Sequence, residues 1–427
     1  MKKVLIISYF FPPCNLTAAQ RIGSWEKYFH EYGYYPIVIT RNWTGNELTE
    51  KERLQNSGHD VRVVKTERSE IYYMPYKSSW RDHCFINSDK NSFYKWTSKL
   101  LTMTMLFLQN FTLKAIPYRN LYYQAREILQ NDPEIECLII SGNPFEQFHF
   151  GYLLKKQFPY LKWIADYRDE WTTSEITEFK GLKKKLWDFQ RKSELRWVNK
   201  ANLITANTNY AVNKLNSLHK KTAKKLLNGF DLETNLSSSP KSEKKLVIVH
   251  NGTLYPTQKL DIFAQGLRKL TIPNGFSVEI YFPGIKIMKD VADKAEELLS
   301  RTSVKFSLTE RVPKKEVLEL QQNADVLLMV AHEGKKGIIG SKLYEYMGLE
   351  KNVLLCPSDN DEIEETLMNT NLGFVASTPD KVAAILQLWI DKKLNGKTIQ
   401  APPNKKEILK FTRKSQTEAL SSYLDEL

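Results

Sequence analysis

The stretch NLSSSPKSEKKLVIVHNGT, residues 235–253, decides how the chain divides into domains. Its first half is polar and rich in serine and lysine, which is typical of a linker. Its second half is an apolar run that ends at a glycine turn, the pattern of a buried strand. The sequence therefore predicts that one domain ends before this stretch and that a second domain begins within it.

Apolar runs alternate with helical patterns on both sides of this linker. Strands are predicted at 4–10, 36–40, 61–67, 137–142, 162–169 and 202–208, and again at 245–253, 276–284, 304–309, 325–331, 352–356 and 373–376. Helical patterns lie at 17–32, 119–130, 146–157, 180–199, 258–270 and 314–323, with another in the tail, 407–427. Alternation of this kind favours mostly parallel, doubly wound sheets. We expect two α/β domains, 1–234 and 245–407.

The size and composition are those of a soluble protein with more than one core. The chain has 427 residues, of which 42% are hydrophobic and 26% are charged, and its length favours two or three domains. The four cysteines (Cys14, Cys84, Cys137 and Cys356) form no CxxC motif and no zinc-type pattern with histidine. This favours a reducing compartment and no structural metal.

The N-terminus, MKKVLIISYFFPP, has a basic start followed by apolar residues. Its apolar run is too short for a signal peptide and no small-residue cleavage site follows, so a first strand is expected. No stretch of the sequence reaches the ~18 apolar residues that a membrane-spanning helix needs.

Positive charge is concentrated in the first half. The net charge is +13, and residues 1–232 hold 35 Lys and Arg against 23 Asp and Glu, a balance of +12. Residues 233–427 hold 27 against 26, a balance of +1. An anionic partner of the first domain is expected. A membrane surface is favoured over nucleic acid, because the basic and aromatic residues follow no known nucleic-acid motif.

Residues 72–118 interrupt the alternation of strands and helices. They are rich in aromatic residues and lysines and include the apolar run LLTMTMLFLQNF at 100–111. Two interpretations stay open. The segment is either a helical insertion that packs on its own domain, or an interfacial element whose apolar residues, flanked by Trp, Tyr and Lys, enter a membrane surface.

Two loops that follow strands of the first domain carry polar candidates, and such loops hold the ligands of open α/β sheets. The loop 8–21 lacks the glycines of a dinucleotide fingerprint, and Asn15 and Arg21 are its candidate contacts. The motif ADYRDEW at 165–171 places Asp166, Arg168 and Asp169 at a strand end. These three either pair with one another or bind the hydroxyl groups of a ligand.

A third loop, SGNPFEQFHF at 141–150, ends a strand and begins a helix that carries His149. A single histidine on an aromatic helix is more often structural than catalytic. A position beside a ligand would give it a catalytic role.

Two motifs of the second domain suggest an anion site. In HNGTLYPTQK, 250–259, Gly252 permits a tight turn, and Lys259 is expected on the next helix, within reach of a phosphate or simply solvated. In GIIGSKLYEYMG, 337–348, Ser341 is the predicted N-cap and Lys342 stands in the first turn. The dipole disfavours a lysine there unless an anion such as a diphosphate binds. The alternative is an exposed pair with Glu345.

Taken together, these motifs resemble the family-four retaining glycosyltransferases. The resemblance follows nearly the whole chain, through KVLIISYFFPP…AAQR, SGNPF…H, ADYRDEWT, NGFD at 228–231, NGTLYPTQK and GSKLYEYMG. SGNPF…H and ADYRDEWT are similar to signatures of the branch that acts on O-antigen and capsule sugars. The resemblance implies the GT-B fold, with two facing Rossmann-like domains and a last helix, 408–427, that crosses back to the first domain.

The same resemblance implies that the second domain holds a nucleoside-diphosphate sugar and the first domain an acceptor. The donor-binding residues would be Gly252, Thr253, Lys259, Arg311, Val312, Gly340, Ser341, Lys342 and Glu345. Lysines and the glycine loop would hold the diphosphate, Glu345 the ribose, and Arg311 and Val312 the base. The acceptor-binding residues would be Asn15, Arg21, Asp166 and Arg168, and the catalytic residues Asp169, His149, Lys259 and Lys342. Neither a cofactor nor a metal is expected.

Some positions depart from the family pattern. The usual Gly-Arg-Leu is Gly252-Thr253-Leu254 here, so the arginine is missing and Lys342 is the candidate replacement. Of two glutamates that the family separates by seven residues, one remains as Glu345, and Gly337 occupies the other position.

The expected function is that of a cytoplasmic, membrane-peripheral sugar transferase that builds a surface polysaccharide on a lipid-linked or saccharide acceptor. One alternative is a nucleotide-sugar epimerase of the same fold, which would leave the basic, aromatic first half unexplained. The other is a non-catalytic carbohydrate-binding or scaffold subunit, which the missing arginine and glutamate favour.

Overall fold

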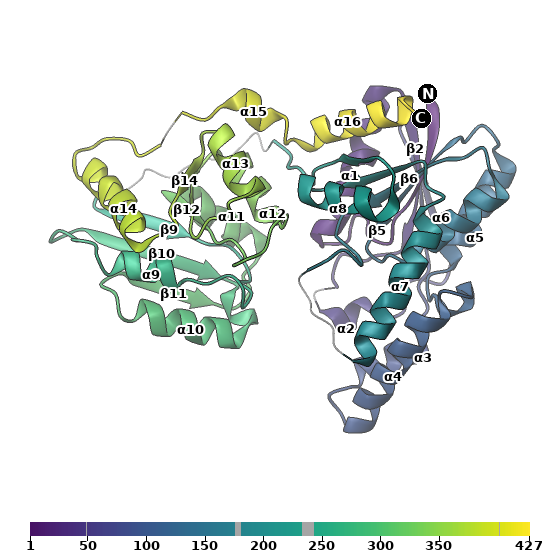
Figure 1. The fold of residues 1–427 in the computed structure, drawn as a ribbon, viewed down its shortest axis with the longest axis horizontal. Coiled ribbons are helices and arrows are strands. Elements are labelled where there is room, and N and C mark those ends of the chain that lie inside the picture. The colour runs from purple at the N-terminus through teal and green to yellow at the C-terminus, as the bar shows by residue number, and fades with distance from the viewer. Residues whose placement is uncertain (48, 176–180, 233–242, 401) are drawn as a thin grey trace. The chain divides into compact units, whose positions relative to one another are not determined.

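A computed structural model describes residues 1–47, 49–175, 181–232, 243–400 and 402–427. Their contacts form two compact units: unit 1 is Met1–Asn228 with Arg413–Leu427, and unit 2 is Gly229–Thr412 (Figure 1). Most of the predicted linker, 235–245, lies outside the described residues. Phe230 belongs to unit 2 because its amide donates to the Phe411 carbonyl at 3.1 Å.

Unit 1 is built on an eight-stranded sheet with the order β3-β4-β2-β1-β5-β6-β7-β8. The strands are β1 (Lys2–Ile7), β2 (Tyr34–Arg41), β3 (Arg62–Lys65), β4 (Glu70–Met74), β5 (Cys137–Gly142), β6 (Lys162–Tyr167), β7 (Leu203–Ala206) and β8 (Ala223–Lys225). All neighbours pair in parallel except β3 and β4. The apolar runs form the central strands, because a parallel sheet is covered by helices on both faces.

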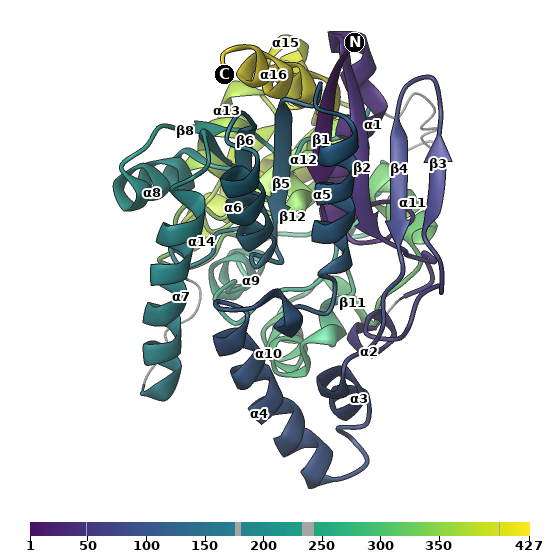
Figure 2. The ribbon, with the colours of Figure 1, turned by 90° about the vertical axis from the view of Figure 1, so that its right-hand side faces the viewer.

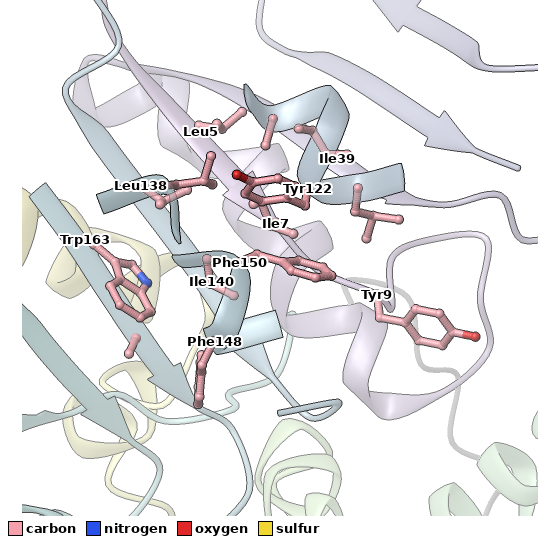
Figure 3. Close-up of a cluster of buried hydrophobic side chains, with 14 of the residues drawn as sticks. Leu5, Ile7, Tyr9, Ile39, Tyr122, Leu138, Ile140, Phe148, Phe150 and Trp163 are labelled. Atoms are coloured by element: carbon pink, nitrogen blue, oxygen red, sulfur yellow. The ribbon is translucent and has the colours of Figure 1, made fainter. Parts of the chain in front are cut away.

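The helices of unit 1 alternate with these strands. They are α1 (Thr17–Tyr28), η1 (Phe29–Tyr32), α2 (Glu50–Arg53), α3 (Trp80–Ile86), α4 (Ser92–Leu108), η2 (Leu113–Ala115), α5 (Asn120–Asn131), α6 (Gln147–Gln157), α7 (Leu182–Val198), α8 (Asn209–His219) and α16 (Arg413–Asp425). The core between sheet and helices is aliphatic and aromatic, with Ile7, Ile140 and Phe148 fully buried (Figure 3). Burial of these side chains supplies most of the driving force for folding.

Strands β4 and β8 were not among the predicted strands. Residues 70–74 run into the aromatic segment without a turn signal, and β8 has the sequence AKK, which lacks apolar alternation. β4 pairs with β2, and β8 pairs with β7. The β4 sequence contains Ile71, Tyr72 and Tyr73, which favour strands, whereas β8 has little β-propensity and depends on its pairing.

The segment 72–118 includes the end of β4 and then α3, α4 and η2, and both interpretations of it stay predictions. Tyr76, Cys84, Ile116 and Tyr118 are buried in unit 1, whereas α4 is mostly exposed. Helices α3 and α4 pack on each other and project from the rest of unit 1 (Figures 1 and 2). Ser98 is the single fully buried side chain of α4. Of the helices described in the structure, none is both long enough and apolar enough to span a bilayer.

Unit 2 has a six-stranded parallel sheet with the order β11-β10-β9-β12-β13-β14. Its strands are β9 (Lys245–Val249), β10 (Ser277–Pro283), β11 (Lys305–Thr309), β12 (Val326–Met329), β13 (Asn352–Leu355) and β14 (Gly373–Val375). Its helices are α9 (Asp261–Leu267), η3 (Ile285–Ile287), α10 (Lys289–Leu299), α11 (Lys314–Asn323), α12 (Ser341–Gly348), α13 (Glu362–Asn369), α14 (Pro379–Leu394) and α15 (Lys405–Leu409). This order is that of a Rossmann-like fold. The predicted pair of Rossmann-like domains is confirmed.

The C-terminal helix α16 packs on α1 and η1 of unit 1. The Gln416 side chain accepts a hydrogen bond from the Leu227 amide at 2.7 Å, and Asp425 accepts one from Tyr34 at 2.8 Å. The predicted return of the last helix to the first domain is therefore confirmed. Residues 405–412, including α15, lie in unit 2.

Candidate functional site

The strand order of unit 2 marks where a ligand is expected. β9 pairs with β10 on one side and with β12 on the other, so the direction of the chain's crossovers changes between β9 and β12. Ligands of open α/β sheets bind outside the carboxyl ends of the strands at such a switch point. The loops after β9 and β12 hold two of the predicted motifs, 250–259 and 337–348.

The turn after β9 requires glycine at two places. Gly252 has φ +84°, in the left-handed region, and its amide donates to the Pro283 carbonyl at 2.7 Å. A Cβ on Gly284 would lie 3.2 Å from the Gly252 Cα. The loops after β9 and β10 therefore approach each other with no room for a side chain.

Lys342 reaches back from α12 to this turn. Its Nζ donates to the Thr253 carbonyl at 2.8 Å and contacts His250 Nε2 at 3.2 Å. A Cβ on Gly252 would meet the Lys342 Cε at 3.3 Å. The ammonium group of Lys342 thus lies beside Gly252 and Thr253. Thr253 is the residue at which the family resemblance implied an arginine.

The start of α12 differs from the prediction in one respect. Gly340, with an extended backbone, is the N-cap, and Ser341 is the first helical residue, so Ser341 is not the cap. No side-chain hydrogen bond caps this helix. Its first amides and the positive end of its dipole are available to an anion.

His250 is a residue that the sequence analysis did not select. It follows β9, is 1% exposed, and its Nδ1 lies 2.8 Å from the Leu328 carbonyl. Since a carbonyl oxygen only accepts, Nδ1 carries the hydrogen and Nε2 is free to accept one from Lys342. Burial, and then the Lys342 charge, hold the pKa of His250 well below its ordinary value, so the ring is neutral.

The same surroundings affect the charge of Lys342. Burial lowers the pKa of Lys342 to about 8, and the negative charge of Glu345 acts in the opposite direction. Both hydrogen-bond partners of the ammonium group are neutral acceptors. A bound anion would supply the neutralising charge that these partners do not.

Glu345 lies one turn further along α12 and is exposed. Its carboxylate accepts a hydrogen bond from Asn251 Nδ2 at 3.3 Å. The Tyr346 hydroxyl accepts from the Asn251 amide at 3.1 Å, which ties this part of the turn to α12. Glu345 therefore presents an acceptor next to Lys342, as predicted, and Lys342 makes its hydrogen bonds elsewhere.

Lys259 is not on a helix as predicted, because α9 begins at Asp261. It lies exposed in the preceding loop and pairs with Glu333 at 2.5 Å. The Glu333 amide donates to the Thr257 carbonyl at 2.7 Å, so the loops after β9 and β12 are joined there. The ion pair raises the pKa of Lys259, and Lys259 is charged and occupied.

Two further predicted donor positions, Arg311 and Val312, follow β11 of this sheet, and Gly337 stands where the resemblance implied a second glutamate. Gly337 has φ +67° and donates its amide to Asp361 Oδ2 at 2.7 Å. The Asp361 carboxylate, 24 residues along the chain, is thus the acid next to the position where the family glutamate is missing. Arg311 and Val312 lie between β11 and α11, and Arg311 is exposed.

In unit 1, Arg21 and Asp166 bind each other. Their side chains form an ion pair at 2.5 Å and are 2% and 0% exposed. Asp166 also accepts hydrogen bonds from Ser141 and Thr205 at 2.7 and 2.8 Å. Neither charge is presented at the surface, and the pair joins α1 to the sheet. Binding of the acceptor by Arg21 and Asp166 stays a prediction.

His149 is also buried. Its ring stacks on Trp197 at 4.7 Å, and its Nδ1 lies 3.0 Å from the Gln109 carbonyl. Burial lowers the pKa of His149 to about 4, so the ring is neutral at physiological pH. The catalytic role of His149 stays a prediction.

Arg168 and Asp169 are at the carboxyl edge of the unit 1 sheet. They pair at 2.8 Å, and Asp169 is 54% exposed. The Arg168 guanidinium lies 5.6 Å from the ring of Phe10, which stacks on Trp43 at 5.5 Å. An exposed carboxylate beside an aromatic surface is suited to sugar hydroxyls and ring faces. Asn15 donates to the Gly45 carbonyl, which orders the neighbouring loop.

Solved structures resemble this chain in fold over its whole length. Sucrose-phosphate synthase from Thermosynechococcus elongatus matches with a TM-score of 0.62 and 10% identity, over 100% of this chain and 99% of that chain. HepE from Anabaena in complex with UDP matches with 0.59 and 13%, over both complete chains. The UDP-forming trehalose-phosphate synthase of Burkholderia xenovorans, solved with glucose-6-phosphate, matches with 0.59 and 10%, again over both complete chains.

These similarities show that the chain has the GT-B fold, with two Rossmann-like units. No protein-family model matches the chain, and no curated protein matches it in sequence. Identities of 10–13% carry no information about substrates. The site chemistry has to come from this chain's own residues.

Proposed function

We propose that this protein is a glycosyltransferase whose unit 2 binds a nucleoside-diphosphate sugar. The observation that carries the proposal is Lys342, a cation with two neutral partners at an open glycine turn, next to an uncapped helix start. A diphosphate supplies the negative charge and the acceptor oxygens that these groups lack. Glu345, next to them, would accept hydrogen bonds from the ribose hydroxyls.

In the proposed reaction, the bond between the anomeric carbon and the distal phosphate oxygen breaks, and its electron pair stays on the diphosphate. The acceptor hydroxyl forms the new bond to the anomeric carbon and passes its proton to the oxygen of the departing diphosphate. Lys342 and the first amides of α12 stabilise the developing negative charge, and a well-placed donor of this kind is worth about 3–4 kcal/mol. Because these groups neutralise the leaving group, the proposal needs no metal and no cofactor.

The structural neighbours support a nucleotide ligand in a general way. One was solved with UDP, and another is described as UDP-forming. Both share the two-unit fold with this chain. Which nucleotide and which sugar the present protein takes is a matter for experiment.

The acceptor is proposed to be a lipid-linked or oligosaccharide chain bound by unit 1. Its support is the edge formed by the partly exposed Phe10 ring with Arg168 and Asp169, together with the +12 balance of residues 1–232. We propose further that transfer retains the anomeric configuration and serves surface polysaccharide synthesis. The enzyme would act peripherally at the inner face of the plasma membrane.

A panel of UDP-, GDP- and dTDP-sugars, screened for thermal stabilisation and then for nucleotide release, tests the proposal. Binding to the native state raises the melting temperature by mass action. We expect one nucleotide class to stabilise the protein and Lys342→Met to abolish the effect. Stabilisation by none of the three, or an epimer formed from UDP-N-acetylglucosamine alone, would contradict the transferase.

A further inference from the structure

We propose that one face of α4 is the surface through which this protein binds an anionic lipid bilayer. The inference rests on the proposed function, in which the acceptor is lipid-linked, and it names the element that contacts the lipid. We call this face the α4 ridge and define it by Phe93, Trp96, Leu100, Met103 and Phe107.

The α4 ridge is a continuous exposed apolar stripe. Phe93, Trp96 and Leu100 are 66%, 75% and 61% exposed, and Met103 and Phe107 are exposed as well. The spacing alternates between three and four residues, so the five side chains fall within an arc of about 80° on the helix. Scattered apolar residues are ordinary at a protein surface, whereas a stripe of five large ones on one helix marks an interaction site.

The opposite face of α4 is anchored, so the ridge is presented in one direction. Arg81 of α3 donates to Thr102 at 3.0 Å, and Ser98 is buried. At the end of the helix, Arg196 of α7 donates to the Asn110 carbonyl at 2.6 Å. Phe107 also stacks on Phe189 of α7 at 5.1 Å. These contacts leave the first four members of the ridge pointing outward.

Positive charges outnumber negative ones around the ridge, where the exposed carboxylate of α7 is Asp188. Helix α4 contains Lys95 and Lys99, both exposed, and neither Asp nor Glu. The α7 helix, which Phe189 joins to the ridge, adds exposed cations at Lys183, Lys184, Lys185, Arg191 and Lys192. Trp, Phe and Leu on one face with lysines beside them are typical of helices that lie in a membrane interface. Anionic headgroups supply the opposite charge.

A second copy of the chain is the less favoured occupant. Pairing two ridges would bring Lys95 and Lys99 of both copies together, and α4 offers no carboxylate to neutralise them. A lipid surface covers the same apolar area and neutralises the lysines at once. Charge complementarity therefore selects the bilayer.

The position of the ridge in unit 1 fits a lipid-linked acceptor. Helices α3 and α4 are inserted in the chain after the carboxyl end of β4, and Figure 2 shows them extending beyond that end of the sheet. Phe10, Arg168 and Asp169 follow β1 and β6 at the same edge, since these strands run parallel to β4. A bilayer on the ridge lies on the side of the sheet where the acceptor edge opens.

Co-sedimentation of the full chain with vesicles tests the proposal. We expect binding to vesicles of phosphatidylcholine and phosphatidylglycerol at 7:3, little binding to phosphatidylcholine alone, and weaker binding at high salt. The double substitution Trp96→Glu/Met103→Glu should lower partitioning by about tenfold or more, because each removes a large apolar contact and adds a repelled charge. Met368→Glu, on a 58% exposed methionine of α13, is the matched control and should bind as the wild type does.

Equal vesicle binding by the wild type and the double variant would overturn the proposal, as would failure of the wild type to bind. A wild-type dimer that the double substitution converts to a monomer would assign the ridge to self-association and overturn it too. Should the double variant misfold, a Met103→Cys protein labelled with an environment-sensitive dye replaces it. A blue shift on vesicles at Met103→Cys but not at Met368→Cys supports the ridge, and its absence refutes it.

A separate assay of nucleotide binding distinguishes a failure of the ridge proposal from a failure of the transferase proposal. Thermal stabilisation by UDP should be the same in the wild type and the double variant, because α4 belongs to unit 1 and the Lys342 site to unit 2. Vesicle binding without any nucleotide stabilisation would leave the ridge standing and remove the transferase. Nucleotide stabilisation without vesicle binding would support the transferase and refute the ridge proposal.

Discussion

The two units share the order of their six central strands but treat charge at the strand ends in opposite ways. In unit 2, Lys342 bonds to two neutral acceptors at an open turn. In unit 1, Arg21 is locked to Asp166 and both are buried. A charged residue after a strand is therefore not sufficient evidence of a binding site. What distinguishes a candidate ligand group is whether the protein itself already neutralises its charge.

The largest expected effect concerns the neutralised pair. Arg21→Met leaves Asp166 charged and buried, which should lower the free energy of unfolding by ~3–5 kcal/mol. Urea denaturation measures this loss. The double substitution Arg21→Met/Asp166→Asn should recover part of it. Wild-type stability in Arg21→Met, combined with a specific loss of acceptor binding, would give Arg21 the ligand role that its burial argues against.

The next substitution separates the backbone strain at Gly252 from a role of the glycine turn in nucleotide binding. Gly252→Ala forces a side chain into φ +84°, at a cost of ~1–2 kcal/mol. It also places a Cβ 3.3 Å from Lys342 Cε, so nucleotide affinity should fall about tenfold. Gly396→Ala is the matched control, since φ is +62° there and no atom lies within 4 Å of the added Cβ. Equal nucleotide affinity in both variants would contradict a ligand role for the turn.

A third comparison uses pH. The pKa of Lys342 is about 8 in the folded protein, and its ordinary value is 10.5. Between pH 8 and pH 10.5 the folded protein without ligand therefore binds fewer protons than the unfolded chain. Its free energy of unfolding should rise with pH in this range. Nucleotide binding needs the protonated amine, so affinity should fall as pH rises through about 8, approaching tenfold per pH unit. Calorimetry at pH 7, 8 and 9 measures the slope. Lys342→Arg does not titrate in this range and should lose the dependence; an unchanged slope would point to another group.

The smallest effect is expected at Lys259. Its partner Glu333 is exposed, and such pairs are worth ~0–1 kcal/mol. Glu333→Gln frees the lysine and should raise nucleotide affinity about two- to fivefold. Glu310→Gln, in the loop after β11, serves as the control substitution. A drop in affinity in Glu333→Gln would show that Glu333 itself contacts the ligand.

Much of the fold could be predicted from the sequence, because its strands are apolar runs separated by helical patterns. The runs at 137–142 and 352–356 became β5 and β13 within one residue. Strand β8 could not be found this way, because pairing with β7 and not local composition places it. Strand β4 was missed although Ile71, Tyr72 and Tyr73 favour a strand. The start of α9 was also not predicted correctly. The helix begins at Asp261, so Lys259 lies in the preceding loop.

The candidate site was predictable only where a local motif carries it. The glycine turn and the Lys342 loop were recognised because glycines and a misplaced lysine are visible in a short window. His250 was missed, since its partners Leu328 and Lys342 are 78 and 92 residues away. The burial of His149 against Trp197 and of Arg21 against Asp166 could not be predicted for the same reason, because these partners come from distant segments.

The central claim is that the ammonium group of Lys342, whose two hydrogen-bond partners are neutral, holds the diphosphate of a nucleotide sugar. Titration calorimetry of UDP into Lys342→Met tests it most directly, with Lys336→Met, an exposed lysine of the same loop, as control. The account predicts an affinity at least about tenfold weaker for Lys342→Met, since a hydrogen bond to a charged group contributes ~1.5–3 kcal/mol, and no change for Lys336→Met. Equal, measurable binding of UDP by all three proteins would contradict it.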